Sequence, residues 1–203
     1  MNKEKYIDDL KDIREMMDRS SRFISLSGLS GVCAGVFSLI GVYLVYNTIY
    51  AGQDYFGYRI TTITLSDIIQ LLIIAAGVII GSIVAGIYFT TRKAKKTNQK
   101  IWDSQTKKYL INLSIPLITG GLLCLMLLYR GYVSLIAPLT LIFYGLALVN
   151  GSHYTLKATF SLGILEILLG LLATYFIGYG LVFWAIGFGG LHIIYGIYMH
   201  FND

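Results

Sequence analysis

The stretch IIQLLIIAAGVIIGSIVAGIYF, residues 68–89, decides the fold of this chain. It contains no Asp, Glu, Lys or Arg, and a helix of about 17–25 such residues crosses the hydrocarbon core of a bilayer. A barrel strand would alternate polar and apolar residues, and this stretch does not. Because a backbone in hydrocarbon must satisfy its own hydrogen bonds, the stretch is predicted to be a transmembrane helix.

Five further apolar stretches of this kind lie on either side of it in the chain of 203 residues. The whole chain is 56% hydrophobic and only 13% charged, whereas a soluble domain carries about a quarter charged residues. We therefore predict an all-α, polytopic membrane protein whose transmembrane domain, residues 23–203, contains six helices. The predicted spans are 23–46, 68–89, 110–128, 133–149, 158–176 and 181–199.

Residues 1–22, MNKEKYIDDLKDIREMMDRSSR, are predicted to form a short amphipathic cytoplasmic helix before the first span. Tyr6, Leu10, Ile13 and Met17 fall at helical spacing on one face. Such a helix can lie on the bilayer or on its own bundle. The alternative is that it docks a soluble cytoplasmic protein.

The basic residues predict how the chain is threaded. Fourteen of the 16 Lys and Arg fall before the first span, between spans two and three, or after span four, and only Arg59 and Arg130 fall on the other side. Cytoplasmic loops carry the Lys and Arg excess, so both termini are predicted to be cytoplasmic. The loop between spans two and three is the richest, with Arg92, Lys93, Lys95, Lys96, Lys100, Lys107 and Lys108. We expect this loop to set orientation and to contact the anionic lipid of the bilayer, with no nucleic acid as partner.

Glu166 is the one carboxylate in the apolar stretch SLGILEILLGLLATYFIG, residues 161–178. An ionised side chain inside a membrane costs about 2.5–3.5 kcal/mol on insertion scales, so Glu166 needs a partner or a proton. Glu166 and His192 each lie 13 residues from Tyr179, where the chain is expected to turn between spans five and six. An antiparallel hairpin would bring them to one depth, and Ser30 in the first span lies about as deep. We predict that these three side chains form an intramembrane polar cluster.

Ser30 lies in GLSG, residues 28–31, which resembles the nucleophile motif of the rhomboid proteases. These are also six-helix membrane proteins, with a catalytic histidine on a late helix. The resemblance covers four residues. The rhomboid serine is on the fourth span, whereas Ser30 is on the first, and the family's histidine motif and first-loop residues are missing here. It implies a Ser–His hydrolase as a remote alternative.

Small residues at intervals of four predict close helix packing, at Gly31 and Gly35 in the first span and at Gly77 and Gly81 in the second. The run GFGG, residues 187–190, lies inside an apolar span without a following Lys-Ser/Thr, so it indicates packing rather than a phosphate loop. Cys33 and Cys124 are isolated and show no metal spacing and no redox pair. No metal and no cofactor is expected.

Two segments, SRFISLSGLSG at 21–31 and LHIIYGIYM at 191–199, make the chain similar to a group of small uncharacterised bacterial membrane proteins. The resemblance implies a bacterial plasma (inner) membrane and no activity. The preferred hypothesis is a non-enzymatic regulatory protein that docks a partner through residues 1–22 and the basic loop. The alternative is a small transporter or channel that uses Glu166 and His192 as a polar relay. A stoichiometric soluble partner would favour the first, and uptake into proteoliposomes the second.

Overall fold

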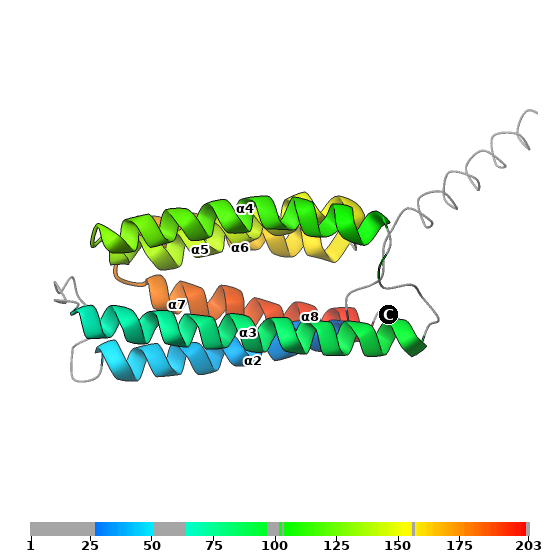
Figure 1. Cartoon of the computed structure of the whole chain (residues 1–203), viewed down its shortest axis with the longest axis horizontal. Helices are drawn as coiled ribbons and strands as arrows, with labels where there is room; N and C mark the ends of the chain where they lie inside the picture. Colours follow the sequence, from blue (N-terminus) through cyan, green and yellow to red (C-terminus); the bar gives the residue numbers. More distant parts are fainter. Residues whose placement is uncertain (1–26, 51–63, 97–101, 103, 156, 202–203) are drawn as a thin grey trace, which may run out of the picture.

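A computed structural model describes residues 27–50, 64–96, 102, 104–155 and 157–201 (Figure 1). Within these residues every regular element is a helix and there is no strand. Six of the helices are long and apolar enough to cross a membrane, which confirms the all-α prediction and the number of apolar helices. The amphipathic helix predicted for residues 1–22 lies outside the described residues.

The six long helices follow one another along the chain. A 3-10 turn precedes the fourth helix and another follows it, and π-helical turns extend the first helix and interrupt the last. The elements are α2 Gly28–Val45 with the π-helix η1 Tyr46–Tyr50, α3 Leu65–Lys96, α4 Ser104–Tyr129, the 3-10 turn η2 Val133–Leu135, α5 Ile136–Gly151, the 3-10 turn η3 Ser152–Tyr154, α6 Lys157–Tyr175, α7 Gly180–Trp184, the π-helix η4 Ala185–Leu191 and α8 His192–Phe201.

Two of these helices extend well beyond the predicted spans into the basic loop. α3 continues past residue 89 to Lys96, and α4 begins at Ser104 rather than at 110. Most of the basic loop is therefore helical, because Lys and Arg are good helix formers and cations in the last turn of α3 complement the helix dipole. The hydropathy pattern marks where apolar residues end, and the helix goes on beyond that point.

The start of α3 is defined by a reciprocal capping interaction. The Thr64 backbone N–H donates to Asp67 Oδ2 at 2.8 Å, and the Asp67 N–H donates to Thr64 Oγ1 at 3.3 Å. Each side chain thus satisfies a backbone donor that the first helical turn leaves free. The acidic residue also suits the positive end of the helix dipole.

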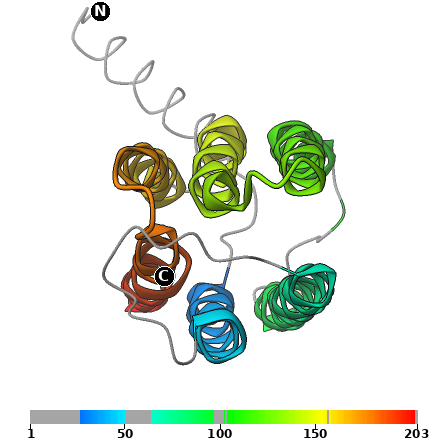
Figure 2. The same ribbon diagram turned by 90° about the vertical axis from the view of Figure 1, so that its left-hand side faces the viewer.

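The helices are arranged in two rows of three (Figure 2). One row is α4, α5 and α6, with α5 in the middle, and the other is α3, α2 and α7–α8, with α2 in the middle. The rows meet chiefly where α5 and α6 face α7, η4 and α8. This junction of the two rows contains the polar side chains described below.

Glycines set the distance between α2 and the last helix. A Cβ atom at Gly31 would lie 3.1 Å from the Cα of Gly196, and one at Gly35 would lie 2.7 Å from the carbonyl oxygen of Gly189. Small residues at these positions let two helix backbones approach closely. In α3, Gly81 lies against the ring of Phe37, whereas no described atom lies within 4 Å of a Cβ at Gly77. Gly77 is therefore an open position beside the face that α3 presents to α2.

The closest approach in the other row is between α5 and α6, at glycines that the sequence analysis did not single out. A Cβ atom at Gly163 would lie 2.8 Å from the carbonyl oxygen of Gly145, and one at Gly170 would lie 2.8 Å from that of Pro138. The two backbones are in direct contact at these points. This contact fixes the rotation of α6 and therefore the direction in which Glu166 points.

The turn between α6 and α7 also needs a glycine. Gly178 has φ of 101°, in the left-handed region where a side chain would be strained. The turn lies where the sequence analysis expected it, next to Tyr179, and it aligns α6 antiparallel to the last helix. Residues equally far from this turn therefore come to the same level.

Candidate functional site: a buried acid–imidazole–phenol cluster

Glu166 lies on the inner face of α6 and is completely buried. The same face carries Gly163 and Gly170, the glycines that contact α5 one turn on either side. Because these contacts fix the rotation of the helix, the carboxyl group points into the junction of the two rows and away from the outer surface. This orientation agrees with the expectation that Glu166 faces the interior of the bundle.

Gly187 makes room for this carboxyl group. A Cβ atom at position 187 would lie 2.5 Å from Glu166 Oε2 and 2.6 Å from Leu141 Cδ2. Gly187 is part of the GFGG run, and the π-helical turn η4 carries it into the junction, where it is buried. The absence of a side chain here therefore serves the carboxyl group as well as helix packing. A π-helical turn in a helix is frequently found at a functional site.

His192 follows η4 and is also buried. Its Nδ1 lies 3.4 Å from Glu166 Oε1 and 3.0 Å from the carbonyl oxygen of Gly187. A carbonyl oxygen only accepts hydrogen bonds, so Nδ1 must carry a proton. The structure thus brings Glu166 and His192 together. Their equal distance from the turn predicted that the two side chains lie at one depth.

Tyr144, on α5, is the third member of the cluster. Its hydroxyl oxygen lies 2.7 Å from Nε2 of His192. Since Nδ1 carries the proton of the neutral imidazole, Nε2 accepts and the Tyr144 hydroxyl donates. Tyr144 was not predicted from the sequence, because depths were compared only for the first span and the last hairpin. A comparison of depths across all spans would have included it, although one tyrosine among 16 does not stand out.

Aromatic rings cover one side of the cluster. The ring of Phe188 lies 4.9 Å from that of Tyr144 and 5.8 Å from that of His192, and the Trp184 ring lies 4.8 Å from Phe188. These rings keep the surroundings of the imidazole apolar. In such surroundings hydrogen bonds and charges interact more strongly than in water, and an unpaired polar group is costlier.

The Glu166 carboxyl group is unpaired in this sense. Within the described part of the chain, neither of its oxygens has a hydrogen-bond partner. Desolvation without a donor disfavours the ionised form, so the neutral acid is the form that suits this position. The cluster is therefore a place where a carboxyl group holds a proton, next to an imidazole able to exchange it.

The three side chains are ordered so that a proton can pass along them. A proton arriving at the Tyr144 oxygen replaces the one that this hydroxyl gives to Nε2 of His192. The Nδ1 proton would then move to an ionised Glu166 when the 3.4 Å separation shortens to hydrogen-bonding distance. The ring finishes with its proton on Nε2, and the carboxyl group finishes neutral. Imidazole suits this role because its two nitrogens exchange protons near neutral pH.

Ser30 is not joined to the cluster by any hydrogen bond between described residues. Its hydroxyl donates to the carbonyl oxygen of Ser27 in its own helix. Both ring nitrogens of His192 are engaged, by Gly187 and by Tyr144. A serine nucleophile needs a base within hydrogen-bond reach, so this arrangement gives the Ser–His hydrolase no geometric support.

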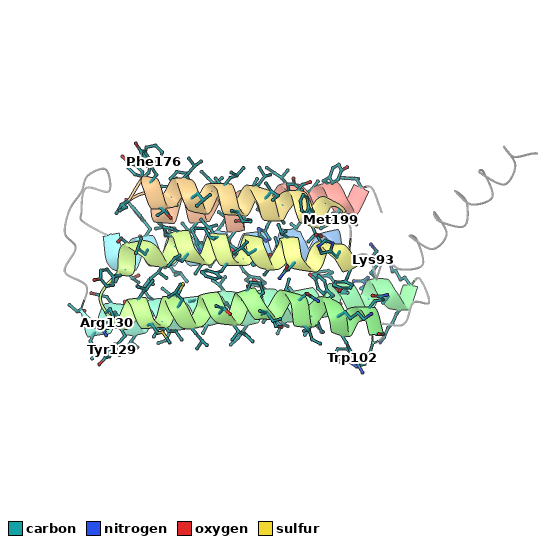
Figure 3. All side chains as sticks on the ribbon, turned by 90° about the horizontal axis from the view of Figure 1, so that it is seen from above. Lys93, Trp102, Tyr129, Arg130, Phe176 and Met199 are labelled. Carbon is teal, nitrogen blue, oxygen red and sulfur yellow. The ribbon has the colours of Figure 1, made fainter. Side chains whose placement is uncertain are left out.

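The predicted basic residues gather at one end of the bundle. Arg92, Lys93, Lys95 and Lys96 lie at the end of α3, and Lys107 and Lys108 lie in the first turns of α4, while Lys100 is outside the described residues. Figure 3 shows Lys93 and Trp102 at this end and Arg130 at the opposite one. The asymmetry of charge along the sequence is thus an asymmetry between the two ends of the bundle.

Among the described residues no three His, Cys, Asp or Glu side chains are grouped so that they could hold a metal ion, and Cys33 and Cys124 are free thiols. Comparison of the chain with models of protein families, with curated proteins and with solved structures gives no match.

Proposed function

We propose that this chain is a multi-pass protein of the plasma (inner) membrane, with both termini in the cytoplasm, that takes up and releases protons at Glu166. It would then belong to the class of small transporters or channels. The six apolar helices support membrane insertion, and the basic end of the bundle supports this orientation. The cytoplasm is the compartment that such a basic end would face.

One observation carries the proposal: the Glu166 carboxyl group is completely buried, next to His192, and without a hydrogen bond within the described residues. A side chain that served packing alone would be apolar, because a leucine would avoid the cost of about 2.5–3.5 kcal/mol for a charged group inside a membrane. An ionisable group at such a position is a functional candidate by default. Tyr144 and His192 supply a second and a third group through which its proton can move.

The test is proton flux into proteoliposomes that contain a trapped pH-sensitive dye, driven by a potassium diffusion potential. The intact protein should acidify the interior faster than empty vesicles, and Glu166→Gln should reduce the flux to the empty-vesicle rate. Gln keeps the size and polarity of the side chain but cannot titrate. Equal flux from the intact protein and from Glu166→Gln would refute the proposal.

A second measurement separates a failed relay from a misfolded protein. Infrared difference spectroscopy should detect the C=O stretch of a buried carboxylic acid in the intact protein, and this band should be missing in Glu166→Gln. The variant should also elute from gel filtration as the intact protein does. A carboxylate band in place of the acid band near neutral pH would contradict the neutral form inferred above.

A regulatory role is the second candidate, and the cations at the ends of α3 and α4 favour it. They form a positive surface at the end that would face the cytoplasm, where an anionic region of a soluble protein can dock. Co-purification from native membranes should then recover a stoichiometric soluble protein. Its loss on deletion of residues 1–22 would support docking through the predicted N-terminal helix.

A further inference from the structure

A shallow, open recess lies on the surface of α3 at its basic end, separate from the buried cluster. It has a volume of about 430 Å³ and is lined by Tyr88, Thr91, Arg92, Lys95 and Lys96. Three of these five side chains are cationic, and none is acidic. The end of the bundle to which it belongs is the one marked by Lys93 in Figure 3.

The lining residues share one face of the helix. Their spacing of three, four, seven and eight residues places them above one another along α3. Lys93 falls on a different side of the helix and is half-buried, and Lys107 and Lys108 belong to α4. The structure thus divides the basic residues into those that line the recess and those that do not. Arg and Lys side chains that share one face can donate hydrogen bonds to the same phosphate group. Such an arrangement is typical of phosphate-binding sites.

The same face of α3 is apolar below the recess. Ile80, Val84 and Ile87 are exposed to 61%, 61% and 60% and continue the line of the recess toward the middle of the helix. The distance from Tyr88 back to Ile80 is about 12 Å at 1.5 Å per residue. α3 has its main contacts with α2, and its most apolar stretch contains no buried residue. A ligand that fits both parts has a phosphate at one end and apolar chains at the other.

We propose that the recess binds the headgroup of an anionic phospholipid, whose acyl chains lie along Ile80, Val84 and Ile87. The three cations favour a lipid with net negative charge over a zwitterionic one, because the choline of the latter would add a positive charge beside them. The apolar face favours a lipid over free phosphate or nucleic acid, neither of which has an apolar part to place there. The inference does not depend on proton transfer at Glu166.

The experiment is native mass spectrometry of the detergent-solubilised full chain with added phosphatidylglycerol, which measures the fraction that carries one bound lipid. The triple variant Arg92→Gln/Lys95→Gln/Lys96→Gln should bind on the order of 100-fold more weakly at an ionic strength of about 0.15 M, where the screening length is about 8 Å. The matched control is Lys93→Gln/Lys107→Gln/Lys108→Gln, which removes the same charge away from the recess. It should change binding by less than about threefold, since distant charges are partly screened. Lys95→Gln alone should give an intermediate loss.

Two results would overturn the proposal. If both triple variants weaken binding equally, the attraction is diffuse charge and not a site. If inorganic phosphate at millimolar concentration displaces the lipid, or phosphatidylcholine binds as tightly as phosphatidylglycerol, the recess is not a site for an anionic phospholipid. Proton flux should be the same in the Lys95→Gln variant and the intact protein, so failure of this proposal is distinguishable from failure of the proposed relay.

Discussion

Glu166 and Gly187 act as a pair, since the missing side chain of one makes room for the carboxyl group of the other. The carboxyl group lies against the backbone of η4, within reach of the His192 ring, and it is enclosed by Leu141 on the α5 side. A buried acid is tolerated here because the surrounding shape admits it and because its neutral form needs less solvation. The same closeness makes position 187 sensitive to a single added methyl group.

Gly187→Ala is therefore expected to lower the free energy of unfolding by about 1 kcal/mol, the low end of overpacking costs, because the two opposing side-chain ends are buried and can shift only in part. The physical cause is the clash of the new Cβ with Glu166 Oε2 and Leu141 Cδ2. The measurement is thermal unfolding in detergent, and the control is Gly77→Ala, where no described atom lies within 4 Å of the new methyl group. In the background Glu166→Ala the cost should shrink, as a double-mutant cycle would reveal. An unchanged cost would mean that the carboxyl group is not what position 187 accommodates.

Tyr144→Phe removes the donor to Nε2 of His192 and leaves the ring in place. We expect a loss of about 0.5–1.5 kcal/mol in the free energy of unfolding, the usual value of one hydrogen bond. Proton flux in proteoliposomes should fall as well, because the imidazole loses the neighbour from which it receives a proton. Tyr175→Phe is the matched control, since Tyr175 is the last residue of α6 and its side chain is 80% exposed. If the Tyr144→Phe variant gave the same proton flux as the intact protein, Tyr144 would not be part of the relay.

At the scale of elements, the contact between α5 and α6 positions the acid. Gly145 and Gly163 bring the two backbones together, and this fixes the rotation of α6 about its axis. In a bilayer, lipid chains are as apolar as leucine, so helices associate through close packing rather than by escape from the solvent. The direction of Glu166 thus depends on residues that carry no chemistry themselves.

Gly163→Leu should separate α5 from α6, because a Cβ at this position would lie 2.8 Å from the carbonyl oxygen of Gly145. We expect destabilisation of about 1–3 kcal/mol or more, measured by thermal unfolding, together with loss of the buried-acid infrared band. Gly121→Leu in α4 is the control, since no described atom lies within 4 Å of a Cβ there. If the two variants unfolded at the same temperature, the α5–α6 contact would not be what stabilises the row of α4, α5 and α6.

At the scale of the whole molecule, two rows of three helices meet along one junction (Figure 2). The contacts among Glu166, His192 and Tyr144 join α6, α8 and α5 at this junction. The cations of α3 and α4 lie at one end of the bundle, in the last turns of α3 and the first turns of α4. The molecule therefore has an inner polar site and a separate basic end. Each has its own proposed ligand, a proton in the first case and an anionic lipid in the second.

The orientation proposed for the bundle predicts the behaviour of reporters. A fluorescent protein fused after Asp203 should be fluorescent, and alkaline phosphatase at the same position should be inactive, because that end is expected in the cytoplasm. Phosphatase inserted between Tyr129 and Tyr132, beside Arg130, should be active. Phosphatase activity from the fusion after Asp203 would reverse the assignment of the two sides.

Length and hydropathy along the chain were enough to predict six helices and their approximate bounds, because crossing a membrane is a requirement on local composition. The equal spacing of Glu166 and His192 from the turn was enough to place them at one depth, since a tight antiparallel hairpin converts sequence distance into height. These are one-dimensional properties, and the sequence by itself determined them. The helical extension of α3 to Lys96 was missed because a helix does not need to end where its apolar residues do.

Only the tertiary structure decided which side chains meet at that depth. Tyr144 joins His192 from α5, Gly187 opens space for Glu166, and Ser30 turns to its own backbone. These outcomes depend on the rotation of each helix about its axis and on which helices are neighbours. Both are set by close contacts between small residues far apart in the sequence, such as Gly145 and Gly163, and no local pattern specifies which small residues will pair.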